Sequence, residues 1–320
     1  MNWFERITGF TETDYATTQA RLQAQAREGR LWHADGQRSW GMGRLEMPTL
    51  LELRARAADS ARGGSGRLGE RRGDVRSLHA EPASSGAVFQ VASQFNLLEM
   101  VGPEVTPERG VTRYAHDGTQ GPACAMAAGA GTLYRNYLVP VAGGMGQTAA
   151  RQIDCSADLG AALGNDDGAL WRLRNGYLLP TSQGLQAIDE RLARGSPAEI
   201  DALRGLLRVG VHWDVEVTDP AAPPGQTVTQ VYCSALPVAY AREAHGPWDR
   251  FATLVLEAAY EATLIVGRLN QARGASPTVF LTRLGGGVFG NRGEWIEGAV
   301  ARAAGMPGMA VLDLRVVRLG

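Results

Sequence analysis

The sequence predicts an α/β fold, and three observations support this prediction. Short apolar runs typical of buried strands alternate along the chain with segments of helical composition. Of the 320 residues, 44% are hydrophobic and 20% are charged, which is close to the averages for globular proteins. A chain of this length can bury a sizeable core, in one large domain or in two ordinary ones.

Apolar runs and capping residues place the individual elements. Strands are expected over residues 87–93, 209–217, 227–238, 279–284 and 311–317. Helices are expected over residues 12–30, 48–58, 124–137 and 249–269, and after the glycines at 285–290. Ser196-Pro-Ala-Glu combines a cap, a proline at the first helical position and a glutamate that reaches back, so a helix should begin there. Residues 61–73 are rich in Gly, Arg and Ser and are expected to form a loop or linker.

Composition excludes several classes of function. A net charge of −1 gives no bulk attraction to nucleic acid or to an anionic membrane. No apolar run approaches the ~20 residues of a membrane helix, and the N-terminal MNWFERITGF lacks a signal-peptide core. Cys124, Cys155 and Cys233 lack metal-ligand spacing, and a sparse, odd count suits a reducing compartment. We therefore expect a cytoplasmic protein without a metal site.

The chain contains no lysine, so the 32 residues counted together as lysine and arginine are all arginines. This excludes a Schiff-base lysine, a Walker-A lysine and the strand lysine of a kinase. Any phosphate that this protein binds must be held by backbone amides or by arginine.

A glycine-rich motif stands between an expected strand and an expected helix. Gly285, Gly287 and Gly290 fit the G-x-G-x-x-G fingerprint of dinucleotide binding, and Asp313 follows roughly 20 residues later. A Rossmann fold would place further strands after this unit, but only three residues follow the last expected strand. Asp313 also lies inside that strand rather than at its carboxyl end. An NAD site, a glycine turn that packs a helix on a strand, and a phosphate loop of another fold all remain open.

A second group of motifs carries a resemblance to a known family. Gly73-Asp74-Val75 is followed by an apolar strand that ends at Asn96, then by residues 228–237 and 278–291 in the same order as in macrodomains. Macrodomains are ADP-ribose-binding modules with an α/β/α arrangement. The resemblance spans residues 71–320 and implies a three-layer α/β/α domain with a mixed sheet, preceded by an N-terminal helical extension of residues 1–70.

The details resemble one macrodomain subgroup more closely. Gln94-Phe-Asn-Leu-Leu-Glu99, Tyr114-Ala-His-Asp117-Gly-Thr-Gln-Gly-Pro122 and Arg135-Asn-Tyr137 are similar to ADP-ribosylhydrolases of the bacterial-effector type that act on arginine. The usual glycine-rich catalytic loop after the asparagine is absent, and acidic residues stand in its place. The chemistry of other macrodomains therefore does not carry over directly.

The resemblance assigns roles in binding ADP-ribose. Asp74 would accept a hydrogen bond from the adenine amino group, beside Val75, and Asn96 would hold the distal ribose. Backbone amides of the glycine loop and the following helix N-terminus would hold the diphosphate, and Phe289 or Trp295 could cover the adenine or the distal ribose. The implied ligand contacts are Asp74, Val75, Gln94, Asn96, Thr119, Gln120, Gly285, Gly286, Gly287, Val288, Phe289, Gly290 and Asn291.

Four carboxylates follow the expected strand end and are candidates for catalysis. Hydrolysis of an N-glycosidic bond passes through an oxocarbenium-like transition state, which carboxylates can stabilise while they activate water or hold a leaving group. Asp117 ranks first, as base or ribose orienter, and Glu99 second, as a ribose or guanidinium contact. Glu104 and Glu108 rank third.

The expected function is therefore hydrolysis of ADP-ribose from a protein arginine, with no cofactor and no nucleic-acid or membrane partner. The expected partners are ADP-ribose and an arginine-linked ADP-ribosylated protein. A non-catalytic reader with the same pocket is one alternative. An NAD-dependent oxidoreductase is the other.

Overall fold

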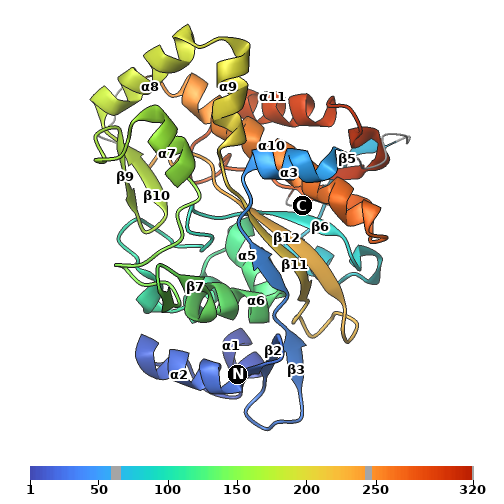
Figure 1. Ribbon diagram of the computed structural model, residues 1–320. Coiled ribbons are helices and arrows are strands. Elements are labelled where there is room, and N and C mark those ends of the chain that lie inside the picture. Colours follow the sequence, from blue (N-terminus) through green and yellow to red (C-terminus); the bar gives the residue numbers. More distant parts are fainter. Residues whose placement is uncertain (59–65, 242–246, 319–320) are drawn as a thin grey trace.

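The computed structural model describes residues 1–58, 66–241 and 247–318, and a mixed sheet of seven described strands forms its centre (Figure 1). The strands, in spatial order, are β4 (Arg44–Glu46), β11 (Gly210–Glu216), β12 (Thr227–Cys233), β6 (Val88–Ala92), β13 (Thr278–Leu281), β14 (Asp313–Arg318) and β5 (Arg67–Arg72). The strands from β12 to β5 are mutually parallel, and β11 runs antiparallel to both of its neighbours. The predicted α/β class with a mixed sheet is confirmed.

Helices cover both faces of this sheet (Figure 1). Two successive residues of β6 show this, because Phe89 stacks on His79 of α4 while the side chain of Gln90 donates to Thr263 of α10. One face carries α3 (Leu50–Ala57), α10 (Asp249–Ala272) and α11 (Gly293–Ala304), with α7 (Ala157–Leu163), α8 (Ser182–Arg194) and α9 (Pro197–Gly205) beyond them. The other face carries α4 (Val75–Ala80), α5 (Gln120–Ala127) and α6 (Gly129–Leu133). The result is the predicted three-layer α/β/α arrangement.

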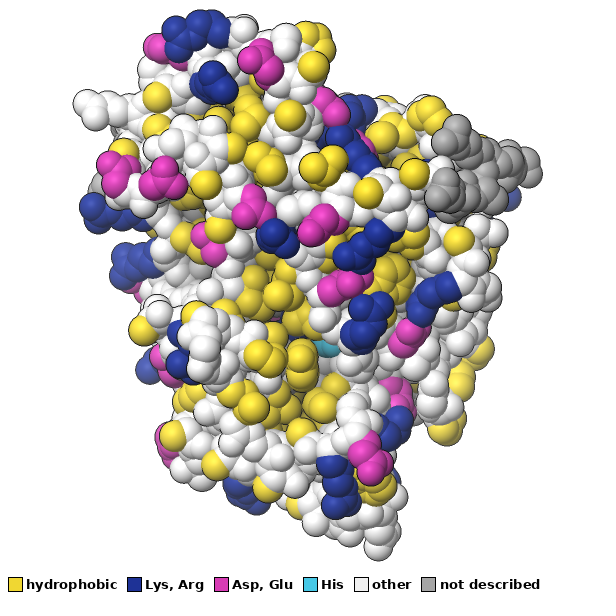
Figure 2. Space-filling model, viewed as in Figure 1, with side chains coloured by type: hydrophobic (Ala, Val, Ile, Leu, Met, Phe, Trp, Pro, Cys, Tyr) yellow, Lys and Arg dark blue, Asp and Glu magenta, His cyan; other side chains and the backbone are white. Residues whose placement is uncertain are grey.

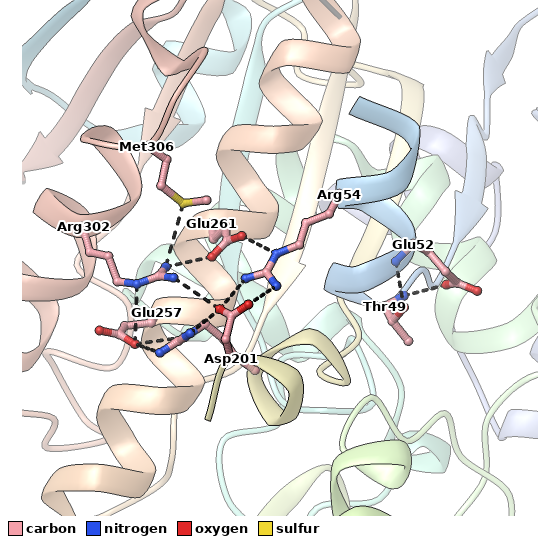
Figure 3. Close-up of polar contacts among 9 residues, drawn as sticks. Thr49, Glu52, Arg54, Asp201, Glu257, Glu261, Arg302 and Met306 are labelled. Atoms are coloured by element: carbon pink, nitrogen blue, oxygen red, sulfur yellow. Dashed lines mark hydrogen bonds and ion pairs between the residues drawn. The ribbon is translucent and has the colours of Figure 1, made fainter. Parts of the chain in front are cut away.

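A network of ion pairs joins the helices on the α10 face (Figure 3). Glu261 of α10 is fully buried and accepts from Arg54 of α3 at 2.6 Å and from Arg302 of α11 at 2.7 Å. Asp201 of α9 pairs with the same Arg54, and Glu257 pairs with Arg204. The network fixes α3, α9 and α11 around the long helix that packs on the centre of the sheet.

The first 43 residues form a smaller unit against the opposite layer. It contains α1 (Trp3–Thr8), α2 (Tyr15–Gln25) and a three-stranded sheet of β1 (Ala26–Arg27), β2 (Arg30–Trp32) and β3 (Ser39–Gly41). Its apolar side chains share a second hydrophobic core with residues of α5 and α6. In Figure 1 this unit lies beneath α6.

The predicted helical extension of residues 1–70 therefore differs from the structure in two ways. Its first part contains strands as well as helices, and its second part belongs to the main layers. β4 and β5 are strands of the central sheet, and α3 packs on α10 through Arg54. Residues 61–65 of the predicted loop lie outside the described residues, while residues 67–72 form the edge strand β5 rather than a loop.

The remaining elements are short. They are the hairpins β7 (Pro140–Val141) with β8 (Gly144–Met145) and β9 (Trp171–Arg174) with β10 (Tyr177–Pro180). The short helical turns are the 3₁₀ turns η1 (Pro82–Ser84), η2 (Pro107–Arg109), η3 (Thr112–His116) and η5 (Met309–Val311), and the π-helical turn η4 (Tyr134–Leu138). The helix predicted over 124–137 is divided among α5, α6 and η4. The predicted helix start at Ser196 is confirmed, with the hydroxyl of Ser196 and the carboxylate of Glu199 each accepting from the other's backbone N–H.

Acidic and basic side chains are interspersed over the face shown in Figure 2, in line with the near-neutral net charge. Within the described ranges, no helix has both the length and the apolar character that crossing a membrane requires.

Candidate active site

A cleft runs along the carboxyl ends of the parallel strands. Two adjoining cavities of about 470 and 370 Å³ form it, and both are lined by Thr119, Gln120, Arg283 and Gly287. The walls come from the segments that follow β5, β6, β12 and β13, together with the first turn of α5 and the end of β14. This edge is the usual position of ligands in α/β sheets.

The cleft opens where two neighbouring strands separate. β6 and β13 pair at Val88 and Phe89, but not beyond. Beyond this point, the carboxamide of Gln120 bonds to the backbone groups of β6 that β13 does not pair. It accepts from the backbone N–H of Ala92 at 3.1 Å and donates to the carbonyl of Gln90 at 3.0 Å. The side chain of Gln90 accepts from the N–H of Thr282 at 3.3 Å. Side-chain amides thus satisfy backbone groups that the splayed strands leave unpaired.

The glycine loop forms the middle of the cleft. Gly285, Gly287, Val288 and Phe289 line one cavity, and Gly286 and Gly287 line the other. The N–H groups of residues 287–289 have no acceptor among the described residues, whereas Gly286, Gly290 and Asn291 donate within the loop. Free amides in a glycine loop suit an anion.

Asp74 and Val75 lie at the end of the cleft that β5 and β14 form. Asp74 caps α4, and its Oδ2 accepts from the N–H and the hydroxyl of Ser77 at 2.9 and 2.8 Å. Partial burial raises the pKa of this carboxyl, but the hydrogen bonds from Ser77 outweigh that effect and lower its pKa. Asp74 is therefore an ionised acceptor with one oxygen engaged by the helix.

Glu99 lies in the other cavity, and its environment is unusual for a carboxyl group. The residue is 4% exposed, and neither carboxyl oxygen has a hydrogen-bond partner among the described residues. Burial raises its pKa to about 8, while Arg135 and the hydroxyl of Tyr114 oppose the rise. At neutral pH the group is mostly protonated, so it can donate a proton to a ligand in the cavity.

Asp117 lines the same cavity and is half-buried. Its Oδ1 accepts from the N–H and the hydroxyl of Thr119 at 2.8 and 2.6 Å, just before α5 begins. Gln94 closes the turn that leads from β6 to Glu99, because its carboxamide accepts from the N–H of Met100 at 2.7 Å and donates to the carbonyl of Met100. The structure thus brings Gln94, Glu99, Asp117 and Thr119 together in the lining of one cavity.

Several predicted site residues lie outside the cleft. Glu104 forms an exposed ion pair with Arg174, and Glu108 accepts from the N–H of Ala149 at 2.8 Å. Asn291 donates to the carbonyl of Leu236, and Gly290 does not line either cavity. Trp295 lies in a separate groove beside α8 and α10, so Phe289 is the aromatic side chain of the two that borders the cleft.

Asn96 is also absent from the cleft lining, which corrects its assigned contact with the distal ribose. The chain turns tightly after β6, with Leu97 in the left-handed region at a φ of 65°. This turn directs Asn96 inward, where its side chain donates to Gln152 and accepts from the N–H of Leu98. Glu99 then returns to the cavity.

Two tyrosines that sequence reasoning missed complete the cavity that holds Glu99. Tyr177, Tyr240 and Phe289 surround one another, with ring centroids 5.0 to 5.6 Å apart. Tyr177 belongs to the hairpin strand β10, and its hydroxyl donates to the carbonyl of Met100 at 2.5 Å. No local motif marks either tyrosine, because each reaches the cavity from a distant part of the chain.

No cluster of three or more His, Cys, Asp or Glu side chains with metal-binding geometry occurs in the part of the chain that the structure describes. All three cysteines are buried thiols.

Comparisons with known proteins were made at the level of sequence and of structure. No protein-family model and no curated protein sequence matches this chain. Several solved structures do. A poly(ADP-ribose) glycohydrolase from Thermomonospora curvata shows 12% identity and a TM-score of 0.48, covering 93% of this chain and 90% of that one.

Two further matching structures are also of poly(ADP-ribose) glycohydrolases. One is the poly(ADP-ribose) glycohydrolase from Thermomonospora curvata bound to the inhibitor ADP-HPD, with 12% identity, a TM-score of 0.46 and coverage of 94% and 91%. The other is a mutant of the Deinococcus radiodurans enzyme in complex with ADP-ribose, with 9% identity, a TM-score of 0.45 and coverage of 86% and 87%. At these scores the matches do not assign a family or an activity to this chain.

Proposed function

We propose that this protein is an ADP-ribosylhydrolase that binds ADP-ribose and hydrolyses the N-glycosidic bond between ADP-ribose and a protein arginine. One observation carries the proposal: Glu99 lines a cavity in the cleft that the glycine loop also lines, and its buried carboxyl group has no hydrogen-bond partner among the described residues. A carboxyl group with a raised pKa in such a position is typical of a general acid.

The cleft offers a place for each part of ADP-ribose. The ionised carboxylate of Asp74 suits the adenine amino group, because it can only accept hydrogen bonds. The free N–H groups of residues 287–289 suit the diphosphate. The distal ribose then falls in the cavity of Glu99 and Asp117, where its hydroxyl groups would satisfy the carboxyl oxygens of Glu99.

The two carboxyl groups can divide the chemistry between them. Glu99 donates its proton to the leaving nitrogen of the guanidine as the bond from that nitrogen to the anomeric carbon breaks. Water adds to the oxocarbenium-like carbon, and Asp117 accepts the proton that this water loses. The products are free ADP-ribose and the restored arginine. Relative to the sequence ranking, Glu99 becomes the acid and Asp117 remains the base.

The walls of this cavity favour a guanidine as leaving group. Guanidinium is a planar cation that pairs with carboxylates and stacks on aromatic faces. Asp117 supplies the carboxylate, and Tyr177, Tyr240 and Phe289 supply the rings in the same cavity. An ester or acetal leaving group would need neither feature.

The test uses a protein that is ADP-ribosylated on arginine, with poly(ADP-ribose) as a second substrate. We expect release of free ADP-ribose from the arginine-linked substrate, and loss of release in Glu99→Gln and Asp117→Ala while calorimetry still shows ADP-ribose binding. Glu104→Gln, which changes an exposed carboxylate outside the cleft, is the matched control and should keep full activity.

Three outcomes would overturn the proposal. If ADP-ribose is released from poly(ADP-ribose) alone, the bond that the protein hydrolyses is the glycosidic bond between ADP-ribose units, not the bond to arginine. Binding of ADP-ribose without release from either substrate would make the protein a reader. Tight binding of NAD(H) without binding of ADP-ribose would favour an oxidoreductase.

A further inference from the structure

The N-terminal unit of residues 1–43 contributes no side chain to the lining of the cleft, yet one of its carboxylates contacts the segment that supports both candidate catalytic groups. We propose that Glu12 is a positioning residue of the active site: it holds the turn η3, which in turn holds Glu99 and Asp117. The effect on kcat that this inference predicts rests on the proposed function. Its second test, amide hydrogen exchange, does not require any enzymatic activity.

Glu12 makes an unusually complete set of hydrogen bonds with residues far along the chain. Its carboxylate accepts from the N–H of Val111 at 2.9 Å, from the N–H of Thr112 at 2.8 Å and from the hydroxyl of Thr112 at 2.5 Å. The hydroxyl of Tyr137 donates to the same carboxylate at 2.7 Å. Every one of these donors is neutral, so the negative charge is held by hydrogen bonds to the start of η3 rather than by an arginine.

The chain around η3 is shaped to admit this carboxylate. Gly110 precedes the turn at a φ of 78°, and a Cβ there would lie 2.6 Å from the carboxylate of Glu12. Val111 and Tyr114 are fully buried in the second hydrophobic core, together with Phe4, Phe10 and other apolar residues of the N-terminal unit. The turn is therefore packed and hydrogen-bonded from the same side.

Two hydrogen bonds connect η3 with the backbone of the candidate catalytic residues. The hydroxyl oxygen of Tyr114 accepts from the backbone N–H of Glu99 at 3.2 Å. The carbonyl of Tyr114 accepts from the backbone N–H of Asp117 at 3.2 Å. Tyr114 thus positions the backbone of both carboxyl residues, and Glu12 positions the turn to which Tyr114 belongs.

A glutamine at position 12 is a sharp probe of this arrangement. It keeps the shape of the side chain but replaces one acceptor oxygen with an NH₂ group, which must face an N–H or O–H donor of η3. Asp14→Asn is the matched control. Asp14 lies in the same connection and caps α2 by accepting from the N–H of Thr17, and its side chain accepts no hydrogen bond from η3. Tyr114→Phe removes the hydroxyl while leaving the buried ring in place.

For catalysis, we expect Glu12→Gln and Tyr114→Phe each to lower kcat about 10- to 100-fold with KM changed less than threefold. Asp14→Asn should stay within twofold of the native protein. The double variant Glu12→Gln with Tyr114→Phe should lose little more than either single variant, because both act through one contact chain. Thermal unfolding of each variant identifies losses that arise only from unfolding.

Amide hydrogen exchange provides the readout that needs no activity. Glu12→Gln should speed exchange of the amides of Val111, Thr112 and Glu99, whereas Asp14→Asn should leave all three unchanged. The idea is wrong if exchange at Glu99 is unaffected by Glu12→Gln, or if the two N-terminal variants lower kcat equally. If the native protein hydrolyses no substrate, the proposed function fails while the exchange experiment still decides the role of Glu12.

Discussion

The guanidinium of Arg135 lies over the ring of Tyr232, with 3.7 Å between Cζ and the ring centroid, and both side chains are fully buried. Arg135 also donates to the carbonyl of Leu97, to the hydroxyl of Thr132 and to Nδ1 of His212. No carboxylate among the described residues pairs with it directly. Its charge instead opposes the rise in the pKa of Glu99.

Replacing Arg135 with methionine should therefore act on both stability and protonation. We expect the free energy of unfolding to fall by about 2–4 kcal/mol, because three buried acceptors lose their donor. The pKa of Glu99 should rise above its native value of about 8. Urea unfolding and NMR titration of the carboxyl carbon measure the two effects, and an unchanged titration midpoint would contradict the electrostatic link.

Stability should depend on pH in a way that singles out Glu99. Its pKa is about 8 in the folded state against an ordinary value of 4.5, so its stabilising contribution is complete below pH 4.5 and is lost as the pH rises to 8. Burial lowers the pKa of His79 to about 4 and that of His212 to about 3, so their contributions are complete above pH 6.5 and are lost as the pH falls. The two histidines outweigh Glu99 below pH 6.5.

Stability is therefore expected to reach its maximum near pH 6.5 and to fall by about 1 kcal/mol towards pH 8, because the loss from Glu99 exceeds the remaining gain from the two histidines. Glu99→Gln should abolish this fall, since glutamine does not titrate, while keeping the decline on the acid side. Urea unfolding from pH 5 to pH 9 checks both limbs. A native protein whose stability is flat between pH 6.5 and 8 would show that Glu99 ionises normally.

Two glycines of the same loop should respond differently to alanine. A Cβ on Gly287 would meet no heavy atom within 4 Å, whereas one on Gly285, at a φ of 72°, would lie 2.5 Å from the Cβ of Ala235. Gly285→Ala should destabilise the fold by about 1–3 kcal/mol. Gly287→Ala should leave stability within about 0.5 kcal/mol but place a methyl group in the cleft.

Calorimetry with ADP-ribose distinguishes the two effects. We expect Gly287→Ala to weaken binding about tenfold or more, because the diphosphate must approach the backbone closely. Native affinity in a stable Gly287→Ala protein would place the diphosphate elsewhere.

A buried ion pair of the network in Figure 3 should contribute more to the free energy of unfolding than an exposed pair elsewhere on the surface. Glu261→Ala leaves Arg54 and Arg302 without their buried partner and should cost about 3–5 kcal/mol. Glu190→Ala removes an exposed pair with Arg194 and should cost less than about 0.5 kcal/mol. Equal losses in urea unfolding would show that the network contributes no more than surface charge.

Much of the fold follows from local sequence patterns. β6, β11, β12, β13 and α10 are continuous apolar or amphipathic runs, so they were predicted close to their observed positions. β5 was not, because four of the six residues of Arg67–Arg72 are charged and no apolar run marks a strand there. As an edge strand that is largely exposed, β5 needs no apolar pattern, and its partner β14 is far away in the sequence.

The candidate site also contains some residues that local sequence patterns identify and others that they do not. The glycine loop and Glu99 follow strands that local pattern identifies, and strand ends converge at one edge of a parallel sheet. Tyr177 and Tyr240 reach the cavity from other parts of the fold, and no local motif marks them. Asn96 was misplaced because the chain turns tightly after β6, at the left-handed residue Leu97, and the side chain of Asn96 bonds to Gln152 and to the N–H of Leu98 inside the fold.

The carboxamide of Gln120, which replaces strand pairing beside β6, has a consequence for how a ligand enters. The hydrogen bonds of Gln120 hold the ends of β6 and β13 apart, so among the described residues the cleft between these strands is already open before ADP-ribose binds. Crystal structures without and with ADP-ribose should then superimpose closely around β6 and β13, and association should proceed without a slow isomerisation step.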